Sequence, residues 1–209
     1  MAIFSDPQTQ NYWNYLDTET DVWTQYVMSG QAVSLFSISY PNYQLVTGIA
    51  DELVETSTNN GDGTWTYSVP ITEGYKWSDG SDLTANDMVF TYNTAKDLGL
   101  LSNWETNYPQ GSGTDPAAEG YAQGILTLVA SDAYTVEITL NFDAGLASWQ
   151  YQIAQAPILP ESYWAQYATD RETLLAASGA DAPVASAFVY NKVEQGAFYT
   201  WAYDANTMW

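Results

Sequence analysis

The chain has 209 residues, of which 46% are hydrophobic and 15% aromatic, so it can bury a sizeable core as one domain or two small lobes. Its 25 acidic and 4 basic residues give a formal net charge of −21 at pH 7, and so few cations exclude nucleic acid as a partner. The absence of histidine and cysteine excludes Ser-His-Asp and Cys-His catalysis, the usual zinc sites and disulfides.

Residues 1–35 are predicted to be helical or irregular, because their large apolar side chains fall near helical spacing. These side chains are Trp13, Leu16, Trp23, Tyr26 and Val27. Residues 45–71 are predicted to form a pair of strands joined through the turn Asn60-Gly61-Asp62-Gly63, whose residue types accept positive φ. In the second strand, alternate side chains are apolar and should share one half-buried face. They are Trp65, Tyr67, Val69 and Ile71, and we expect them, like Trp77, to pack in the core.

A capped helix is predicted over Thr84–Asp97. Thr84 stands at the N-cap position and Asp87 follows three residues later, where a capping box usually has Glu or Gln. Apolar residues then recur at helical spacing through Ala95. Residues 98–120 are rich in Gly and Pro and are predicted to form a long loop, which in a compact domain is usually functional or mobile.

Residues 124–141 are predicted to form a β-hairpin with Ser131-Asp132 in its turn. The apolar residues that alternate along its second strand are Val136, Ile138 and Leu140. The rest of the chain is predicted to contain helices at 144–155 and 161–177, a turn at 179–183, and one or two strands within 186–203. The predicted fold class is therefore α+β, with mixed or antiparallel sheets and packed helices rather than regular βαβ units.

Two carboxylate pairs, Asp79 with Asp82 and Asp51 with Glu52, could in principle support glycoside hydrolysis. Their sequence context favours turn and surface positions instead. No spacing matches a calcium loop, and no Gly-rich segment has the lysine of a phosphate-binding loop. We therefore expect no catalytic residue, no metal site and no cofactor.

The charge balance results from a scarcity of Lys and Arg, because charged residues make up only 14% of the chain against about 25% in typical domains. Such a surface is consistent with an acidic medium outside the cell, with a halophilic source, or with another extracellular setting. Mutual repulsion among carboxylates predicts raised pKa values in the folded state, so that stability would rise as the pH falls from 7 toward about 4.

Several blocks of the sequence resemble, in the same order, the solute-binding proteins of oligopeptide and dipeptide ABC importers (bacterial extracellular solute-binding protein family 5). The most specific is GYKWSDGSDLTANDMVFTY, residues Gly74–Tyr92. The others are Leu35-Phe36 with Leu45–Leu53, Ile125–Leu140, Ala156–Trp164 and Pro183–Trp209. The last block departs from the family, since Ala185 and Ala187 replace glycines and Phe188 replaces a proline near the expected hinge.

The resemblance implies the first lobe of a two-lobed fold similar to periplasmic binding proteins, with the second lobe absent from these 209 residues. Within that lobe we expect 45–180 to form an inserted hairpin and helix lobe, and 1–44 with 181–209 to begin the main lobe. The closure of two lobes around a ligand, typical of relatives, would then require the missing lobe.

The implied function is that of a non-enzymatic, extracytoplasmic protein that delivers oligopeptides or oligosaccharides to an ABC permease. It would lie outside the cell or at its surface, with any membrane anchor in a segment outside this chain. Trp104 and Tyr108 are the expected ligand-binding residues, partly exposed on one open face near 102–110, because aromatic rings offer large flat areas to ligands. The alternative is a structural cell-surface assembly protein that reuses the same lobe.

Overall fold

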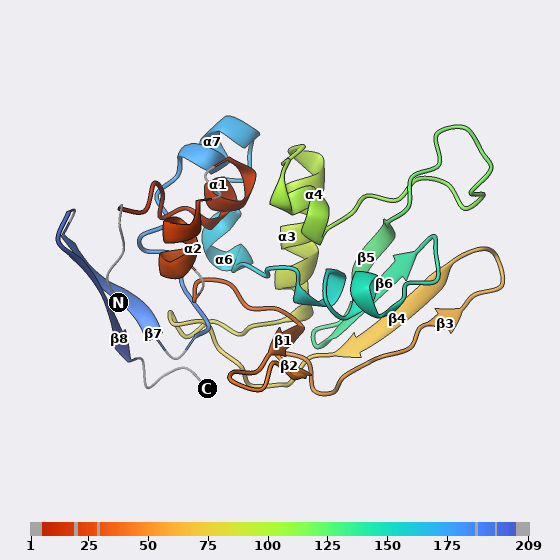
Figure 1. Ribbon diagram of the computed structural model, residues 1–209, viewed down its shortest axis with the longest axis horizontal. Helices are drawn as coiled ribbons and strands as arrows, with labels where there is room; N and C mark the ends of the chain where they lie inside the picture. The colour runs from red at the N-terminus through yellow and green to blue at the C-terminus, as the bar shows by residue number, and fades with distance from the viewer. Residues whose placement is uncertain (1–5, 19–20, 29, 187, 195, 204–209) are drawn as a thin grey trace.

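The computed structural model describes residues 6–18, 21–28, 30–186, 188–194 and 196–203 (Figure 1). Its helices are α1 (Tyr12–Asp17), α2 (Val22–Met28), α3 (Ala85–Asp97), α4 (Asn103–Asn107), α5 (Leu146–Trp149), the 3-10 helix η1 (Ile153–Gln155), α6 (Glu161–Trp164) and α7 (Arg171–Ala176). Its strands are β1 (Phe36–Ile38), β2 (Leu45–Thr47), β3 (Thr58–Asn59), β4 (Trp65–Pro70), β5 (Ile125–Asp132), β6 (Thr135–Leu140), β7 (Phe188–Glu194) and β8 (Phe198–Tyr203). All strand pairs are antiparallel, and the predicted α+β class is confirmed.

The largest sheet has the strand order β3-β4-β6-β5. Tyr67 lies opposite Ile138 and Val69 opposite Val136, so the apolar faces predicted for β4 and β6 coincide and are buried. The predicted pairing within 45–71 is only partly correct. The short β3 pairs with the start of β4 across the predicted turn, whereas β4 pairs along its whole length with β6, and β2 pairs with β1.

The β5–β6 hairpin turns at Ala133-Tyr134, so the prediction that Ser131-Asp132 forms the turn is wrong by two residues. Asp132 nevertheless shapes the turn from the end of β5, because its Oδ1 accepts the Tyr134 N–H at 2.8 Å. The strand register shifts between Ala130 and Asp132. The additional residue, Ser131, therefore lies within strand β5 and not in the loop.

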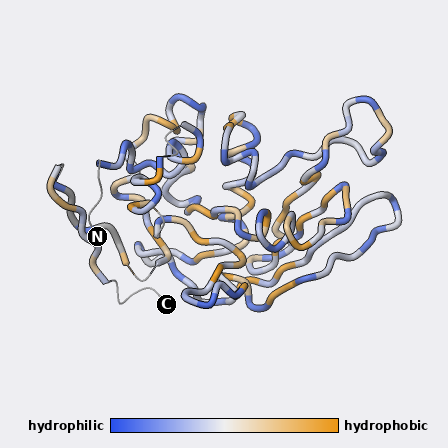
Figure 2. The backbone as a smooth tube through the Cα atoms, in the orientation of Figure 1, coloured by the Kyte–Doolittle hydropathy of each residue, from blue (hydrophilic) through white to orange (hydrophobic). Residues whose placement is uncertain are grey.

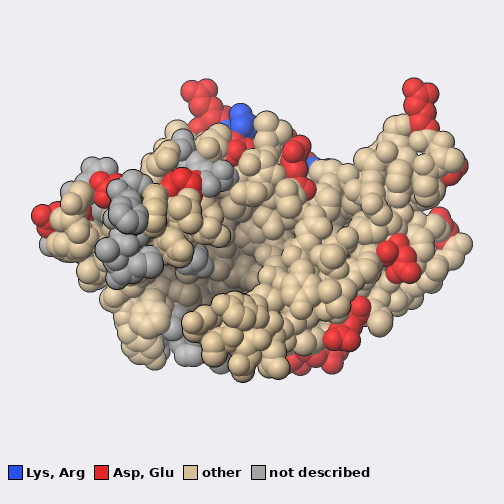
Figure 3. All heavy atoms as spheres, viewed as in Figure 1, with Lys and Arg blue, Asp and Glu red and all other residues tan. Residues whose placement is uncertain are grey.

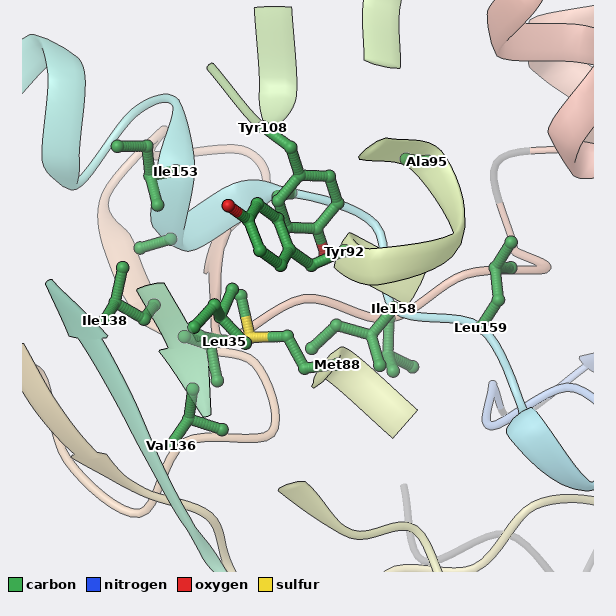
Figure 4. Packing of buried hydrophobic residues seen from close by; sticks show 14 of the residues in the cluster. Leu35, Met88, Tyr92, Ala95, Tyr108, Val136, Ile138, Ile153, Ile158 and Leu159 are labelled. Atoms are coloured by element: carbon green, nitrogen blue, oxygen red, sulfur yellow. The ribbon is translucent and has the colours of Figure 1, made fainter. Parts of the chain in front are cut away.

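Helix α3 begins as predicted. Thr84 is its N-cap in extended conformation, and Thr84 with Asp87 forms a capping box in which the Thr84 N–H donates to Asp87 Oδ2 at 2.9 Å. The helix packs against β5 and β6. Figure 4 shows Met88 of this helix among Leu35, Val136 and Ile158. The sheet, α3 and the segment around Ile158 therefore share one core.

The predicted helices outside α3 are shorter or displaced. Residues 98–120 contain α4, which the Gly and Pro content did not predict. The 144–155 region holds only α5 and η1, and the 161–177 region is divided into α6 and α7 by turns at 165–169. The helical prediction for 1–35 is confirmed over α1 and α2, while residues 1–5, 19–20 and 29 lie outside the described part.

The molecule is elongated, with the β7–β8 hairpin at one end and the β3–β4 turn at the other (Figure 1). Helices α1 and α7 contact each other, and α1 also contacts α4. Figure 2 shows hydrophobic residues concentrated in the inner strands and in α3, with hydrophilic residues in the β3–β4 turn. A single hydrophobic cluster extends from Trp13 through the sheet to Leu174.

Candidate functional site

The two residues predicted to bind ligand lie in the core. Trp104 and Tyr108 are each 1% exposed, so the expectation of partial exposure is wrong. The Trp104 ring stacks on Trp13 with ring centroids 4.7 Å apart, and its Nε1–H donates to the Trp13 carbonyl oxygen at 3.0 Å. The Tyr108 hydroxyl donates to the Pro157 carbonyl oxygen at 2.8 Å. Helix α4 and its C-cap Tyr108 thus direct both rings inward, toward α1 and toward Pro157.

Burial also fixes the chemistry of Tyr108, because removal from water raises the pKa of its phenol above the ordinary value, and nearby Tyr12 adds to the shift. The hydroxyl therefore stays a neutral hydrogen-bond donor. Neither Trp104 nor Tyr108 presents accessible surface to a ligand in this structure.

A polar groove that the sequence did not predict lies between the start of the described chain, the segment after α7, and β8. We call it the N-terminal groove; it has a volume of about 570 Å³. Its lining residues are Pro7, Gln8, Thr9, Gln10, Asn11, Ala177, Ser178, Gly179 and Tyr199. None of these described lining residues carries a charged side chain, although the chain has a net charge of −21. Amides, hydroxyls and a phenol suit hydrogen bonding to neutral polar ligands.

Asn11 holds the two walls of the groove together. Its Nδ2–H₂ group donates to the carbonyl oxygens of Leu174 at 2.7 Å and Ala177 at 2.9 Å, which end helix α7. Its Oδ1 accepts the Trp13 N–H at 2.9 Å, which begins helix α1. One buried amide thus caps one helix and satisfies the carbonyls of another.

Gly179 allows the same two segments to approach closely. A Cβ atom at this position would lie 2.0 Å from the Gln10 carbonyl oxygen, so the backbones meet where only glycine fits. The β7–β8 hairpin is attached beside them. Asp6 Oδ2 accepts the Gly196 N–H at 2.9 Å, and Asp6 Oδ1 accepts the Tyr199 hydroxyl at 2.8 Å.

The Asp6 carboxylate thus lies at the edge of the groove, hydrogen-bonded to Tyr199. In Figure 3 acidic side chains stand at the rim of the face turned toward the viewer, and the hollowed middle of that face shows none. A second hollow contains the carboxylates Asp51, Glu73 and Asp132. Within the described residues, however, no group of three or more acidic side chains is arranged to hold a metal ion.

In the described part of the chain, no helix combines the length and the apolar character needed to cross a bilayer.

Comparison with known families places this α+β unit in a class of binding proteins. The sequence model for "Bacterial extracellular solute-binding proteins, family 5 Middle" matches residues 46–204. The chain therefore belongs to this family, as its motifs predicted. None of the curated proteins compared with it is a match.

Solved structures show the same fold. A periplasmic oligopeptide-binding protein from Thermotoga maritima, bound to mannohexaose, matches with TM-score 0.65 and 19% identity, over 98% of this chain and 32% of that one. The oligopeptide-binding protein AppA from Bacillus subtilis, in complex with a nonapeptide, gives 0.60 and 16%, over 98% and 36%. DppA from Helicobacter pylori, in complex with the peptide STSA, gives 0.65 and 15%, over 98% and 38%. This chain thus spans about a third of the structures that it matches.

Proposed function

We propose that this chain supplies one side of an extracytoplasmic binding site that delivers oligopeptides or oligosaccharides to an ABC permease. The observation that supports the proposal most directly is the match of 98% of the chain to binding proteins whose structures contain mannohexaose or a peptide. The matched family and these relatives are solute-binding proteins, so the alternative of a structural assembly protein has no support.

We propose that the N-terminal groove is the ligand-facing part of this chain and that it has no catalytic role. Its uncharged amide and hydroxyl lining can pair with peptide groups or sugar hydroxyls without excluding either. The division into 45–180 and 1–44 with 181–209 remains part of this proposal, with a second lobe completing the site. The proposed location is outside the cell or at its surface, with any anchor supplied from outside the chain.

The proposal is tested by titrating the ¹⁵N-labelled chain with short neutral peptides and with mannohexaose while its backbone amide signals are recorded. We expect shifts at residues 8–11 and 177–179, with millimolar affinity, because half a cleft buries only part of a ligand. Gln8→Ala should weaken binding, while Gln123→Ala, an exposed glutamine in a distant loop, should not. Micromolar binding would show that the site is complete without a second lobe, and absence of shifts in the groove would refute its assignment.

A further inference from the structure

The tip of the β1–β2 hairpin, residues Ser39–Gln44, exposes two aromatic rings. We call this segment the hairpin tip. Tyr40 is 83% exposed and Tyr43 is 69% exposed. The two rings meet edge to face, with centroids 5.9 Å apart and an interplanar angle of 82°. Two flat apolar faces are therefore presented to the solvent at different angles.

The hairpin tip is held in one shape by its own hydrogen bonds. The Ser39 N–H donates to the Gln44 carbonyl oxygen at 2.8 Å, and the Tyr43 N–H donates to the Ser39 carbonyl oxygen at 2.8 Å. The Gln44 N–H also donates to Ser39 Oγ at 3.2 Å. A backbone closed in this way loses little freedom when a ligand binds.

Tyr43 has φ of 53°, in the left-handed region that glycine or asparagine adopts more readily. A turn that needed only to reverse the chain would favour one of those residues. The Tyr43 ring is largely exposed, so burial in the core does not offset the strain of its backbone. A large side chain kept at such a position indicates that the ring has a function of its own.

Charge defines what this surface can accept. No Asp, Glu, Lys or Arg occurs from Val22 to Ala50, although the whole chain contains 25 acidic and 4 basic residues. The lower middle of the face in Figure 3, over the β1–β2 hairpin, accordingly shows no charged side chain. The amides of Asn42 and Gln44 flank the two phenols and offer both donors and acceptors.

We propose that the hairpin tip binds the ring face of a neutral sugar, at a place separate from the N-terminal groove and independent of the function proposed for it. The C–H face of a hexose packs on an aromatic ring, and its hydroxyls can pair with the amides and phenols around it. The tip has no cation to hold a phosphate or carboxylate, and the net charge of −21 repels an anionic membrane surface.

The test uses the ¹⁵N-labelled 209-residue chain with maltohexaose and cellohexaose as soluble probes, and cosedimentation with insoluble cellulose as the polymeric probe. We expect amide shifts at residues 39, 40 and 42–44. Replacement of both tyrosines by asparagine, which tolerates the positive φ of Tyr43, should weaken binding roughly fivefold to tenfold. Tyr40→Phe with Tyr43→Phe should weaken binding less than the asparagine variant, because the ring faces remain and only the hydrogen bonds of the two phenols are lost.

Tyr151→Asn is the matched control, since Tyr151 is exposed on a different segment. Circular dichroism shows whether each variant is folded, and Tyr40→Asn alone replaces the double variant if that one unfolds. The proposal is overturned if 39–44 show no shift, if the asparagine variants bind like the wild type, or if shifts appear only in the N-terminal groove. Shifts that follow protein concentration without sugar would show instead that a second copy covers the tip, which also overturns it. Binding only to cellulose, or only to the soluble oligosaccharides, supports the proposal and shows whether the sugar ligand is a polymer or a free oligosaccharide.

Discussion

Trp104 joins parts of the molecule that are far apart in sequence. Its ring stacks on Trp13 and is nearly parallel to the Tyr108 ring, whose centroid lies 6.4 Å from its own. Its indole N–H is satisfied by a backbone carbonyl of helix α1. Such a side chain contributes to stability through area burial and through the hydrogen bond, so its loss should be felt across the helical end of the molecule.

Trp104→Ala should lower the free energy of unfolding by about 4 kcal/mol, since it leaves a large cavity between α1 and α4. Urea denaturation followed by circular dichroism measures the change. Trp201→Ala serves as the control, because Trp201 is 38% exposed and its removal should cost much less. Equal costs for the two variants would contradict a core role for Trp104.

Asp87 is a buried carboxylate with three donors around it. Its Oδ2 accepts the N–H of Thr84 at 2.9 Å and the Nε1–H of Trp77 at 3.3 Å. Its Oδ1 accepts the Glu161 N–H at 2.9 Å, at the start of α6. Asp87→Ala would leave these donors without their acceptor and should cost about 3 kcal/mol in unfolding free energy. Asp97→Ala, at the exposed end of the same helix, should change stability little.

The pH dependence of Asp87 has a definite sign. Burial raises the pKa of this carboxyl above its ordinary value of 3.8, and the charge of Glu161 adds to the effect, against the hydrogen bonds that lower it. Between the unfolded and folded pKa values the native state binds more protons, so its stability rises as the pH falls through that window. The stability of the wild type relative to Asp87→Asn, which does not titrate, should therefore increase on acidification. A decrease, measured by urea denaturation at several pH values, would contradict this sign.

At the scale of elements, the crossing of the N-terminal segment with the segment after α7 depends on Gly179. Gly179→Ala would place a methyl group against the Gln10 carbonyl oxygen and should cost about 2 kcal/mol, as overpacked sites usually do. Gly145→Ala is the control, since a Cβ at Gly145 would have no neighbour within 4 Å. Thermal denaturation compares the two, and an equal effect would show that the backbones separate without cost.

The elements that could be predicted from the sequence are those with a local signal. The period-two faces of β4 and β6 and the cap of α3 follow from neighbouring residues, and the structure confirms them. Helix α4 and the burial of Trp104 depend instead on Trp13, which is distant in sequence. Periodicity and turn residues carry no information about such a contact.

The N-terminal groove was missed for the same reason, although weak signals existed. Asn11 precedes an apolar segment and is a favoured N-cap residue, and Gly179 follows a helical stretch. Neither signal shows that these two positions are adjacent. Only the family motifs indicated where a ligand-binding lobe lay, and the residues they favoured for ligand contact are buried.

For the whole molecule, the net charge of −21 predicts a strong dependence on salt. Raising NaCl from about 0.1 to 1 M shortens the screening length from roughly 10 to 3 Å, which weakens repulsion in the folded state. The thermal midpoint at pH 7 should therefore rise with salt. Near pH 3, where most carboxylates are protonated, the same salt should have little effect. An unchanged midpoint at pH 7 would show that repulsion is not limiting.

Local contacts, rather than overall repulsion, set the pKa shifts of particular carboxyls. Hydrogen bonds from the Thr64 side chain and N–H lower the pKa of Asp62, and those from the Thr173 N–H and side chain lower the pKa of Asp170. The stability that these two groups contribute is present above their unfolded pKa and is lost as the pH falls through their folded values. Their effect on stability has the opposite sign to that of Asp87. The gain in stability expected on acidification therefore does not apply to every carboxylate.

The hydrogen bonds of the Asn11 side chain to the carbonyls at the end of α7 also bear on the order in which the elements fold. They join residues up to 166 positions apart, from Asn11 to Ala177. A chain made from its N-terminus exposes the Asn11 side chain long before its partner carbonyls exist. The sheet and α3 can form meanwhile from nearer contacts, because closing a long loop costs more entropy than closing a short one. We therefore expect helix α1 to join helix α7 only after the sheet and α3 have formed.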